Sequence, residues 1–566
     1  MKKTLLFCSL IASVFSVQAQ PWTNAVIDIN QVETRINSNG DLFWDYTSGL
    51  YEVPNDSGAN TMFAGASWIG GLDAGGQLHL GAQTYRQSGS DFYPGPVMNT
   101  ANYSAANDLL WNKVWKINKT TIDSFLTWCS WPWMYPGYTI PSAITSWPAH
   151  GDVNQGQALQ LAPFVDRDGD GMYNPVAGDY PCIKGDQALF VIFNDDRNIH
   201  TETGGTKLGL EIHAMMYAYS APGTWLDSTV FINYQLFNRS SVSYHDMYWG
   251  QWTDFDLGSP FDDYVGCDVT RSIGYAYNGG LYDGGNASPG PGHYGANPPA
   301  QGVAILRGPE ATPLDGIDND RDGVIDEADE TWAMGHFVFY NNNFTTTGNP
   351  VTAQDHYDYL SGYWLDGSPF TYGGNGYGGS TPAAFMFPGT SDPLGWGTNM
   401  VPQIPWDEAS SGNTPNDRRA LTSAGPFQFD AGKQMCIAVA YVFGRGTSGP
   451  ASGVRAMQNA TDSANVFYAQ NNPCTCDENT VGIQSHSSET IGLYPNPANE
   501  SINIICGDNS TGSTVEIIDV NGKVVKTAMV LSGNSVIVNT SNLAAGVYFV
   551  RVNKGSVVLM SKFVRN

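Results

Sequence analysis

Long runs of β-branched and aromatic residues, bounded by turn residues, constrain this chain most strongly. Residues 188–193 (Ala-Leu-Phe-Val-Ile-Phe) and 436–442 (Cys-Ile-Ala-Val-Ala-Tyr-Val) are apolar throughout and do not alternate with polar positions. Runs of this kind form strands that are buried on both faces, as in the core of a sandwich. The sequence therefore predicts a mainly β protein, with a large β-sandwich-type body of one or two packed domains.

A few helices are expected among the strands. Leu109, Leu110, Val114 and Ile117 recur at helical spacing, which predicts a helix within residues 104–127. Two short helices are expected near 353–364 and 453–469. Residues 366–400 are rich in Gly, Pro, Ser and Thr and predict long surface loops.

The last seventy or so residues carry a separate pattern. Residues 515–520 and 523–526 alternate between apolar and polar positions and are joined by Asn521-Gly522. Because both turn residues tolerate a positive φ, this is a strong hairpin signal. With further strands at 535–539 and 547–552, the pattern predicts a small β-sandwich of six or seven strands that folds alone.

Four short motifs in this tail carry a family resemblance. They are Tyr-Pro-Asn-Pro at 494–497, Asp-Val-Asn-Gly-Lys at 519–523, Leu-Ala-Ala-Gly-Val-Tyr at 543–548 and Lys-Phe-Val at 562–564. The tail resembles the type A C-terminal sorting domain of the type IX secretion system of Bacteroidota. The resemblance implies recognition by the secretion machinery, passage across the outer membrane, and release or attachment to surface glycolipid after removal of the tail.

The N-terminus agrees with export. Lys2 and Lys3 precede an apolar run at 4–17, and residues 17–19 fit a small-residue cleavage site, which predicts a signal peptide. No later stretch reaches the roughly 20 apolar residues of a transmembrane helix, so no transmembrane segment is expected. The predicted organisation is a signal peptide at 1–19, an N-terminal part of a β-rich body at 20–160, a body with calcium loops at 161–470, a linker at 471–492 and the sorting domain at 493–566.

Acidic residues concentrate in the body, which holds 49 of the 53 Asp and Glu residues but only 18 of the 26 Lys and Arg residues. A surface this negative repels nucleic acid and anionic membranes, so neither is expected as a partner. The same surface attracts divalent cations.

The body also keeps six cysteines, and an even number in an exported chain permits disulfides. No Cys-x-x-Cys pair occurs, so neither a zinc site nor a thioredoxin-like motif is predicted. Fifteen pairings of six cysteines are possible, and all of them stay open. The six are Cys129, Cys182, Cys267, Cys436, Cys474 and Cys476.

The pattern Asp-x-Asp-x-Asp-Gly-x-x-(Asp/Asn) occurs twice, at 166–174 and at 318–326. Alternate carboxylates in a tight loop converge on one point, and the glycine permits the sharp turn that follows. A hard cation that takes six to eight oxygen ligands suits such a loop, so calcium is the expected cofactor. Its expected role is to pin long loops and stabilise the folded state.

These loops resemble the calcium loops of EF-hand, dockerin and thrombospondin type 3 proteins. Neither loop is flanked by two clear helices, so an EF-hand architecture is not expected. At loop position 12 the first copy has Ala177, where nearby Asp179 can substitute, and the second copy has Asp329. The other ligands implied are Asp166, Asp168, Asp170, the Met172 carbonyl and Asn174 in the first loop, and Asp318, Asp320, Asp322, the Val324 carbonyl and Asp326 in the second.

Catalytic motifs are scarce. Gly-x-Ser-x-Gly, His-Glu-x-x-His and a phosphate-binding Gly-Lys-Ser/Thr loop are all absent. His200, His213 and His245 are expected to be structural histidines, and no catalytic residue is predicted. A glycosidase needs only two carboxylates at a set separation, so that possibility stays open. A third acidic group is expected to form an acidic loop rim rather than a cation site: Asp254, Asp256, Asp262, Asp263 and Asp268.

Four aromatic residues near the predicted helix allow a second functional idea. Trp128, Trp131, Trp133 and Tyr135 could form a sugar-stacking platform, although aromatic residues more often fill cores. The core interpretation is the one favoured here.

Segments of the body resemble a set of Bacteroidota surface proteins, a resemblance that implies a surface context and no activity. It rests on segments such as 66–73, 85–87, 161–166 and 178–181. The leading hypothesis is an exported, calcium-stabilised, non-enzymatic protein of adhesion or envelope structure, at the cell surface or outside the cell. The alternative is a carbohydrate-binding or polysaccharide-degrading secreted protein. The body's ligand would be a surface glycan or a protein, and a peptidase is disfavoured.

Overall fold

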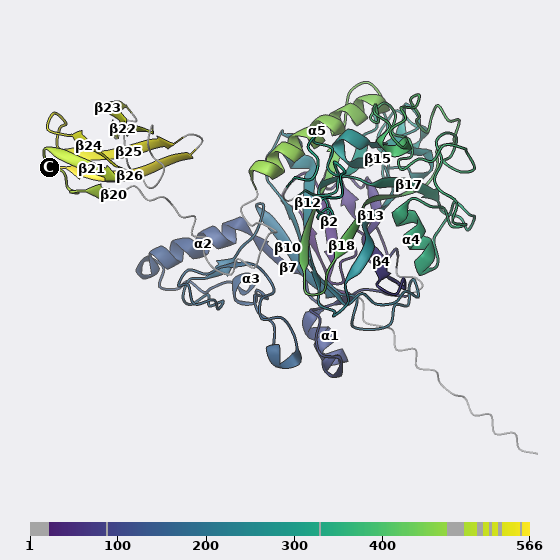
Figure 1. Ribbon diagram of the computed structural model, residues 1–566, viewed down its shortest axis with the longest axis horizontal. Helices are drawn as coiled ribbons and strands as arrows, with labels where there is room; N and C mark the ends of the chain where they lie inside the picture. Colours follow the sequence, from purple (N-terminus) through teal and green to yellow (C-terminus); the bar gives the residue numbers. More distant parts are fainter. Residues whose placement is uncertain are drawn as a thin grey trace, which may run out of the picture. The chain divides into compact units, whose positions relative to one another are not determined.

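The computed structural model describes residues 22–85, 89–327, 330–471, 492–505, 513–519, 523–529, 535–554 and 557–566. They fall into two compact units, a large body and a small C-terminal unit. The predicted signal peptide and nearly all of the predicted linker lie outside these ranges. Both units are built mainly of antiparallel sheets with few helices, which confirms the predicted fold class (Figure 1).

The larger sheet of the body has nine strands in the order β14-β15-β16-β19-β12-β11-β10-β6, with β7 also paired to β10. Every residue of β10 is buried, as its continuous apolar run predicts. The strands are β6 (Tyr93–Pro94), β7 (Trp115–Asn118), β10 (Gln187–Asn194), β11 (Leu210–Ala218), β12 (Thr229–Asn238), β14 (Asp263–Asp268), β15 (Ile273–Asn278), β16 (Ala300–Arg307) and β19 (Gln434–Gly444).

A five-stranded sheet has the order β17-β18-β13-β4-β5. Its strands are β4 (Met62–Asp73), β5 (Leu78–Gly81), β13 (Tyr244–Phe255), β17 (His336–Asn341) and β18 (Arg418–Phe429). Smaller antiparallel pairings join β1 (Asn24–Ile27), β2 (Glu33–Asn37) and β3 (Tyr51–Glu52), and join β8 (Phe164–Val165) to β9 (Tyr180–Pro181).

The two large sheets pack face to face around one hydrophobic core. Tyr234 of β12 meets Trp249 of β13 with 5.9 Å between ring centroids, and its hydroxyl donates to Gln251. Side chains alternate along a strand, so Trp252 and Asp254 point to the opposite, outer face of the five-stranded sheet. This outer face carries the cavity described below.

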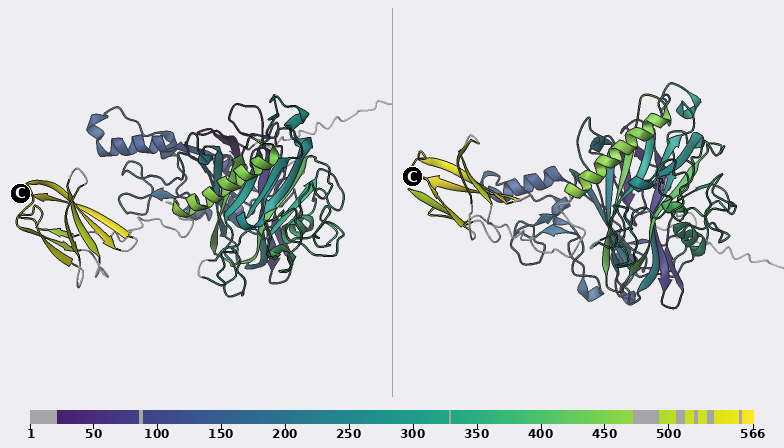
Figure 2. Two further views of the ribbon diagram at one scale, coloured as in Figure 1. Left: turned by 90° about the horizontal axis from the view of Figure 1, so that it is seen from above. Right: turned by 45° about the horizontal axis from the view of Figure 1, so that its top comes forward.

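Helices cover the outer faces of both sheets. Helix α5 (Pro450–Gln470) lies along the nine-stranded sheet, where Phe467 packs against Phe231 (Figures 1 and 2). Helix α4 (Ala353–Ser361) packs on the five-stranded sheet, with Leu360 lying against Gly250. A capping box between Thr352 and Asp355 fixes the start of α4 by satisfying backbone N–H groups.

The predicted helices over 353–364 and 453–469 are confirmed, but the single helix expected within 104–127 is wrong. The chain there forms α1 (Ala105–Trp111), then β7, then α2 (Lys119–Ser130), which extends away from the sheets (Figure 1). Leu110 is exposed on α1, whereas Trp115 and Ile117 alternate with half-buried residues in β7. Pairing with the edge of β10 therefore overrides the helical spacing.

Two of the body's cysteines, Cys182 and Cys436, are disulfide-bonded. Cys129 and Cys267 are free thiols, and Cys267 is buried. The body is therefore cross-linked, as an exported chain permits.

The described residues of the C-terminal unit form seven strands around a core of its own, which includes Ile502, Ile517, Val550 and Phe563. A three-stranded sheet joins β20 (Gly492–Tyr494), β21 (Ser501–Ile505) and β24 (Ser535–Asn539). A four-stranded sheet joins β22 (Thr514–Asp519), β23 (Val524–Met529), β25 (Gly546–Lys554) and β26 (Val557–Arg565). The turn at 520–522 lies outside the described residues, but β22 and β23 pair as the predicted hairpin requires.

Candidate functional site

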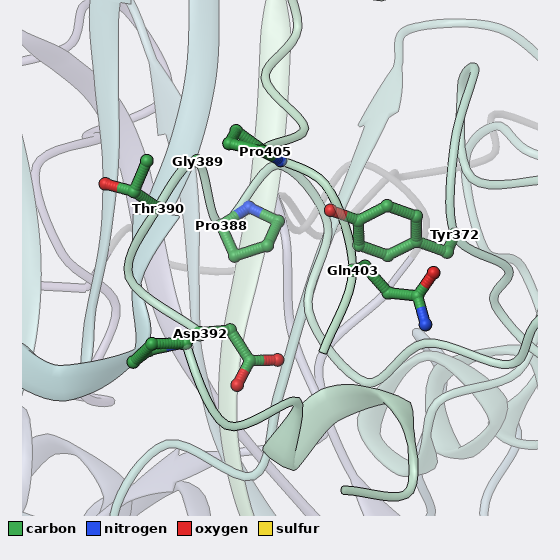
Figure 3. Close-up of a pocket in the computed structure, with 8 residues that line it drawn as sticks. Tyr372, Pro388, Gly389, Thr390, Asp392, Gln403 and Pro405 are labelled. Atoms are coloured by element: carbon green, nitrogen blue, oxygen red, sulfur yellow. The ribbon is translucent and has the colours of Figure 1, made fainter. Parts of the chain in front are cut away.

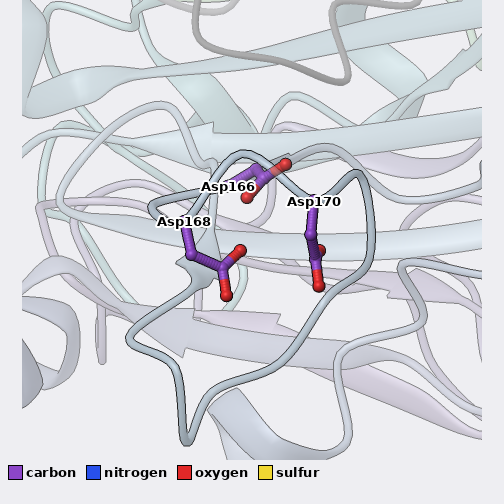
Figure 4. Close-up of side chains that lie close together, drawn as sticks. All are labelled: Asp166, Asp168 and Asp170. Carbon is purple, nitrogen blue, oxygen red and sulfur yellow. The ribbon is translucent and has the colours of Figure 1, made fainter.

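The first acidic loop follows β8 and brings three carboxylates together. Ligand oxygens of Asp166, Asp168 and Asp170 lie within 4.8 Å of one another (Figure 4). Asp166 is buried, and the other two are exposed. A hard cation that binds carboxylate oxygens fits this donor set.

The side chains of Asp179 and Asn174 accept hydrogen bonds from backbone N–H groups in and after this loop. Asp179 is fully buried, and its two carboxylate oxygens accept hydrogen bonds from the backbone N–H groups of Arg167 and Asn174, both at 2.8 Å. The Asn174 side chain accepts from the Val176 N–H at 3.1 Å. Asp179 is outside the carboxylate cluster, and the ligand roles of Asn174 and of the Met172 carbonyl stay predictions.

The second loop forms two overlapping clusters. Asp318, Asp320 and Asp322 meet within 4.8 Å, and Asp320 also meets Glu327 and Glu330.

Other predicted ligands of this loop lie differently. Asp326 accepts a hydrogen bond from the Gly316 N–H at 2.9 Å and is outside both clusters. The ligand role of the Val324 carbonyl stays a prediction. Asp329 lies outside the described residues. Glu327 and Glu330, which follow the loop directly in the sequence, lie with Asp320 in the second cluster.

Arg321 ties the second loop to the body. Its guanidinium donates to the backbone carbonyls of Val269 and Met334 and lies over the rings of Phe385 and Trp396, 5.2 Å and 5.8 Å from their centroids. Burial lowers the pKa of Arg321 to about 10. The alternating aspartates are thus held on a backbone that is anchored at its middle.

The third acidic group is not the exposed rim that was expected, because Asp254, Asp263 and Asp268 are buried. Asp263 accepts from the Leu257 N–H, and Asp268 accepts from Arg271. These two carboxylates therefore serve the fold.

Asp254 belongs to a different cluster. It meets Asp256 and Asp417 within 4.8 Å at the end of β13. Burial, the charge of Asp254 and that of Asp417 raise the pKa of Asp256 to about 8. Burial also raises the pKa of Asp254 to about 7, against the opposing effect of Arg419.

A cavity of about 410 Å³ lies on the outer face of the five-stranded sheet, between the strands and the segment that leads into α4. We call it the sheet-face cavity. Its lining comes from loops and strands far apart in the sequence: Trp44, Phe63, Thr84, Tyr85, Glu202, Asp254, Tyr340, Asn342, Phe344, Asn349, Pro350, Val351, His356 and Arg419.

Aromatic rings form one wall of this cavity. Trp44 and Phe63 lie with 4.7 Å between ring centroids, and Tyr85 lies 6.2 Å from Phe63. The Trp44 indole N–H donates to the Tyr85 carbonyl at 3.3 Å, which ties the wall together. Tyr340 is held by a 2.6 Å hydrogen bond from the indole N–H of Trp252.

A charged network forms the floor. The Tyr85 hydroxyl donates to Asp254 Oδ2 at 2.7 Å, and Arg419 donates to the same hydroxyl at 2.8 Å. Arg419 also pairs with Asp254 at 3.3 Å and with Asp417 at 2.7 Å. The Oδ1 atom of Asp254 is buried and has no hydrogen-bond partner, apart from that ion pair.

Two further polar groups of the cavity have an atom without a partner. Glu202 Oε1 accepts from the hydroxyl and N–H of Thr84, at 2.6 Å and 3.3 Å, whereas Oε2 is buried without a hydrogen bond. His356 Nδ1 lies 2.8 Å from the Thr352 carbonyl. Because a carbonyl only accepts, Nδ1 carries the hydrogen, and the buried Nε2 has a lone pair without a partner.

Burial sets the protonation of both groups. It raises the pKa of Glu202 to about 7, so a large share of this carboxyl is protonated at neutral pH. It lowers the pKa of His356, so the imidazole is neutral. At neutral pH a partly protonated carboxyl group and a neutral imidazole therefore share one cavity.

A second hollow offers less chemistry. It has a volume of about 200 Å³ and is lined by Tyr372, Gly389, Thr390, Asp392, Gln403 and three prolines (Figure 3). Asp392 uses both carboxylate oxygens to accept from the backbone N–H groups of Trp396 and Gly397. Both carboxylate oxygens of Asp392 therefore hold the backbone of its own loop.

The aromatic residues after α2 are exposed, so the expectation that they fill a core is wrong. The exposed fractions are 51% for Trp131, 69% for Trp133 and 44% for Tyr135, and Met134 beside them is 62% exposed. Trp128 stacks on Tyr138 with 5.3 Å between centroids. These rings are presented to solvent on a part of the body that extends away from the sheets.

No curated protein matches this sequence. Among solved structures, one described as a polysaccharide lyase is 8% identical with a TM-score of 0.18, over 63% of this chain and 34% of that chain. A biofilm-associated protein, BSP domain, is 9% identical with a TM-score of 0.15, over 67% and 59%. The chain spans about a third of the length of the lyase. Likenesses this low indicate neither a fold nor an activity for the body.

Among the described helices, none has the length and apolar character needed to cross a bilayer.

The C-terminal unit matches a known family. Residues 492–566 match the family described as the secretion system C-terminal sorting domain. The C-terminal unit is therefore a type IX sorting domain, and the chain is cargo that this system exports across the outer membrane to the surface or the medium.

Proposed function

We propose that this exported protein binds carbohydrate outside the outer membrane, in the sheet-face cavity. The observation that carries the proposal is the combination of an aromatic wall, formed by Trp44 and Phe63, with polar side chains that line the same cavity. Such side chains can donate hydrogen bonds to a ligand with hydroxyl groups and accept hydrogen bonds from it.

A sugar suits both parts of this lining. Its ring has an apolar face that packs on aromatic side chains, and its hydroxyls donate and accept hydrogen bonds at the ring edge. A volume of about 410 Å³ lies within the range of small-molecule sites, which runs from about 300 to 1,000 Å³. The cavity therefore has room for one or two sugar units.

We also propose that the two acidic loops hold calcium in a structural role. The cluster around Asp168 and the one around Asp320 each offer three carboxylates within 4.8 Å, the donor type that calcium prefers. A bound ion would neutralise the repulsion among them. It would also stabilise only the folded state, which suits loops of this length.

The exposed rings of Trp131 and Trp133 favour a second candidate, adhesion without catalysis. Large apolar side chains that cluster on a protein surface often mark a site of interaction with another molecule. In this case the contact surface is the segment after α2, and the sheet-face cavity has no role in it.

A glycan array on the purified full chain separates the two candidates. We expect binding to a defined glycan class that Trp44→Ala abolishes and Trp133→Ala leaves intact, with both variants melting as the wild type does. The opposite result, loss with Trp133→Ala alone, would assign binding to the exposed segment. Absence of binding from a folded, calcium-loaded protein would reject carbohydrate recognition.

A further inference from the structure

Two body cysteines, Cys182 and Cys436, take part in disulfide bonds. The other two cysteines in the described part of the body, Cys129 and Cys267, are free thiols. A disulfide joins two residues whose Cα atoms lie about 4.4–6.8 Å apart. The places of Cys182 and Cys436 in the fold therefore limit which cysteines can be their partners.

Cys182 and Cys436 are too far apart to bond to each other. Strand pairing places Cys436 of β19 level with Ile192 of β10. Cys182 lines a groove together with Tyr219, which lies beyond the first residue pair of β10 and β11. The levels of Ile192 and Tyr219 are separated by about six residues of strand, or about 20 Å. Strand β19 also lies two strands away from β11, which adds to the separation.

Four more cysteines remain in the sequence: Cys8, Cys474, Cys476 and Cys506. Cys8 lies in the predicted signal peptide, which a mature exported protein lacks. Cys506 lies in the sorting domain, and a bond to it would keep that domain attached after the removal that its family implies. Cys474 and Cys476 follow α5 closely, so they are the cysteines left to pair with the body.

The end of α5 shares a groove with Cys182. This groove has a volume of about 780 Å³ and lies between α2, the β8–β9 pair and the end of α5. Its lining includes Cys182, Asn471 directly after α5, and the apolar side chains of Ile122 and Phe467. Three residues of extended chain span about 10 Å. Cys474, three residues after Asn471, is therefore within reach of Cys182.

Cys436 faces the same side of the nine-stranded sheet as α5. Its two neighbours in β19, Met435 and Ile437, belong to the core between the sheets, so Cys436 points to the outer face. Helix α5 covers this face and contacts β19. Phe467, near the end of α5, packs on Phe231, whose partner in β19 is four residues, or about 13 Å, from Cys436. A chain that continues from α5 over this face can reach both body cysteines.

We propose that Cys474 forms a disulfide with Cys182 and that Cys476 forms one with Cys436, so that two cross-links fasten the chain after α5 to the body. Each bond forms by exchange with a disulfide donor. Two thiols of the chain lose two protons and two electrons as the new S–S bond forms, and the donor disulfide is reduced to two thiols. The connection to the sorting domain is then free of the body only from residue 477 onward.

Peptide mapping of the full chain without reductant tests the cross-links. Free thiols are alkylated under denaturing conditions, and the chain is cut with trypsin and with a protease specific for glutamate. We expect one product in which peptides 168–184, 434–445 and 456–478 are held together and which reductant separates. Three results would each overturn the proposal: alkylated Cys182 or Cys436, a product that joins these two directly, or a link to the peptide that contains Cys506.

Variants of the full chain assign the pairs. In the double variant Cys474→Ser/Cys476→Ser, both Cys182 and Cys436 should become alkylated, and their protection in this variant would contradict the proposal. Cys129→Ser, at a free thiol on α2, is the control and should leave the map unchanged. Cys474→Ser alone should expose Cys182 and leave Cys436 bonded, and the reverse result would overturn the assigned order. The map of the wild type needs no variant, so it decides the proposal even if a variant misfolds.

Discussion

Asp256 shows how a single side chain can make stability depend on pH. Burial together with the charges of Asp254 and Asp417 raises its pKa to about 8 in the folded protein, from an ordinary value of 3.8. The folded state therefore binds a proton more tightly than the unfolded state does. The stability that this proton contributes is complete below about pH 4 and is lost as the pH rises toward 8.

Asp256→Asn should remove this dependence, because asparagine resembles the protonated side chain and carries no charge. We expect the variant to melt a few degrees above the wild type at about pH 8 and at the same temperature at about pH 4. Asp123→Asn, which changes an exposed aspartate on α2, is the control and should show no such pH-dependent gain. Equal melting temperatures of the Asp256→Asn variant and the wild type at both pH values would contradict the explanation. Calorimetry at constant calcium makes the comparison.

The residues of the sheet-face cavity could not be found from the sequence. Glu202 follows β10, Asp254 ends β13 and His356 lies in α4, and no local motif links the three. The acidic loops could be predicted from the sequence, because the alternate spacing of Asp166, Asp168 and Asp170 is enough to bring their carboxylates together. A site whose residues all lie in one short segment can be recognised from the sequence. A site whose residues come from distant segments of a sheet cannot.

At the scale of elements, the second acidic loop depends on its anchor. Arg321 makes two hydrogen bonds to backbone carbonyls and lies over two aromatic rings. Lysine keeps the charge but lacks the planar fork that reaches both carbonyls. Loss of the anchor would free the backbone that positions Asp320 and its neighbours.

Arg321→Lys should therefore weaken calcium binding at this loop. We expect calcium to raise the melting temperature of the wild type, a chelator to reverse the rise, and the variant to need a higher calcium concentration for the same shift. Arg455→Lys, on α5, is the matched control. An identical calcium response of the wild type and Arg321→Lys would show that the contacts of Arg321 do not contribute to calcium binding at this loop.

The elements themselves divide into those that local sequence determines and those that packing determines. Apolar runs predicted strands such as β10 and β19, and the Thr352–Asp355 capping box marks the start of α4. Around Trp115 the local pattern is helical, but pairing with β10 buries Trp115 and Ile117 in a strand. Tertiary contacts decide such short segments, because their intrinsic preferences are small.

At the scale of the whole molecule, the sorting domain determines where the body works. It has its own hydrophobic core, so its removal should leave the fold of the body intact. We expect a chain that ends at residue 491 to remain in the periplasm, whereas the full chain reaches the surface or the medium. Cell fractionation with an antibody against the body measures this. Export of the truncated chain would contradict the role of the tail.

The order of strands in the nine-stranded sheet affects how the protein is made. Strand β19, which begins at Gln434, lies between β12 and β16 in the middle of that sheet. Until it is translated and translocated, β12 and β16 each present an open, apolar edge that invites pairing with another chain. The body therefore cannot mature progressively from its N-terminus. Its sheet closes late in biogenesis, and a chain interrupted before residue 434 would leave the edges of β12 and β16 unpaired.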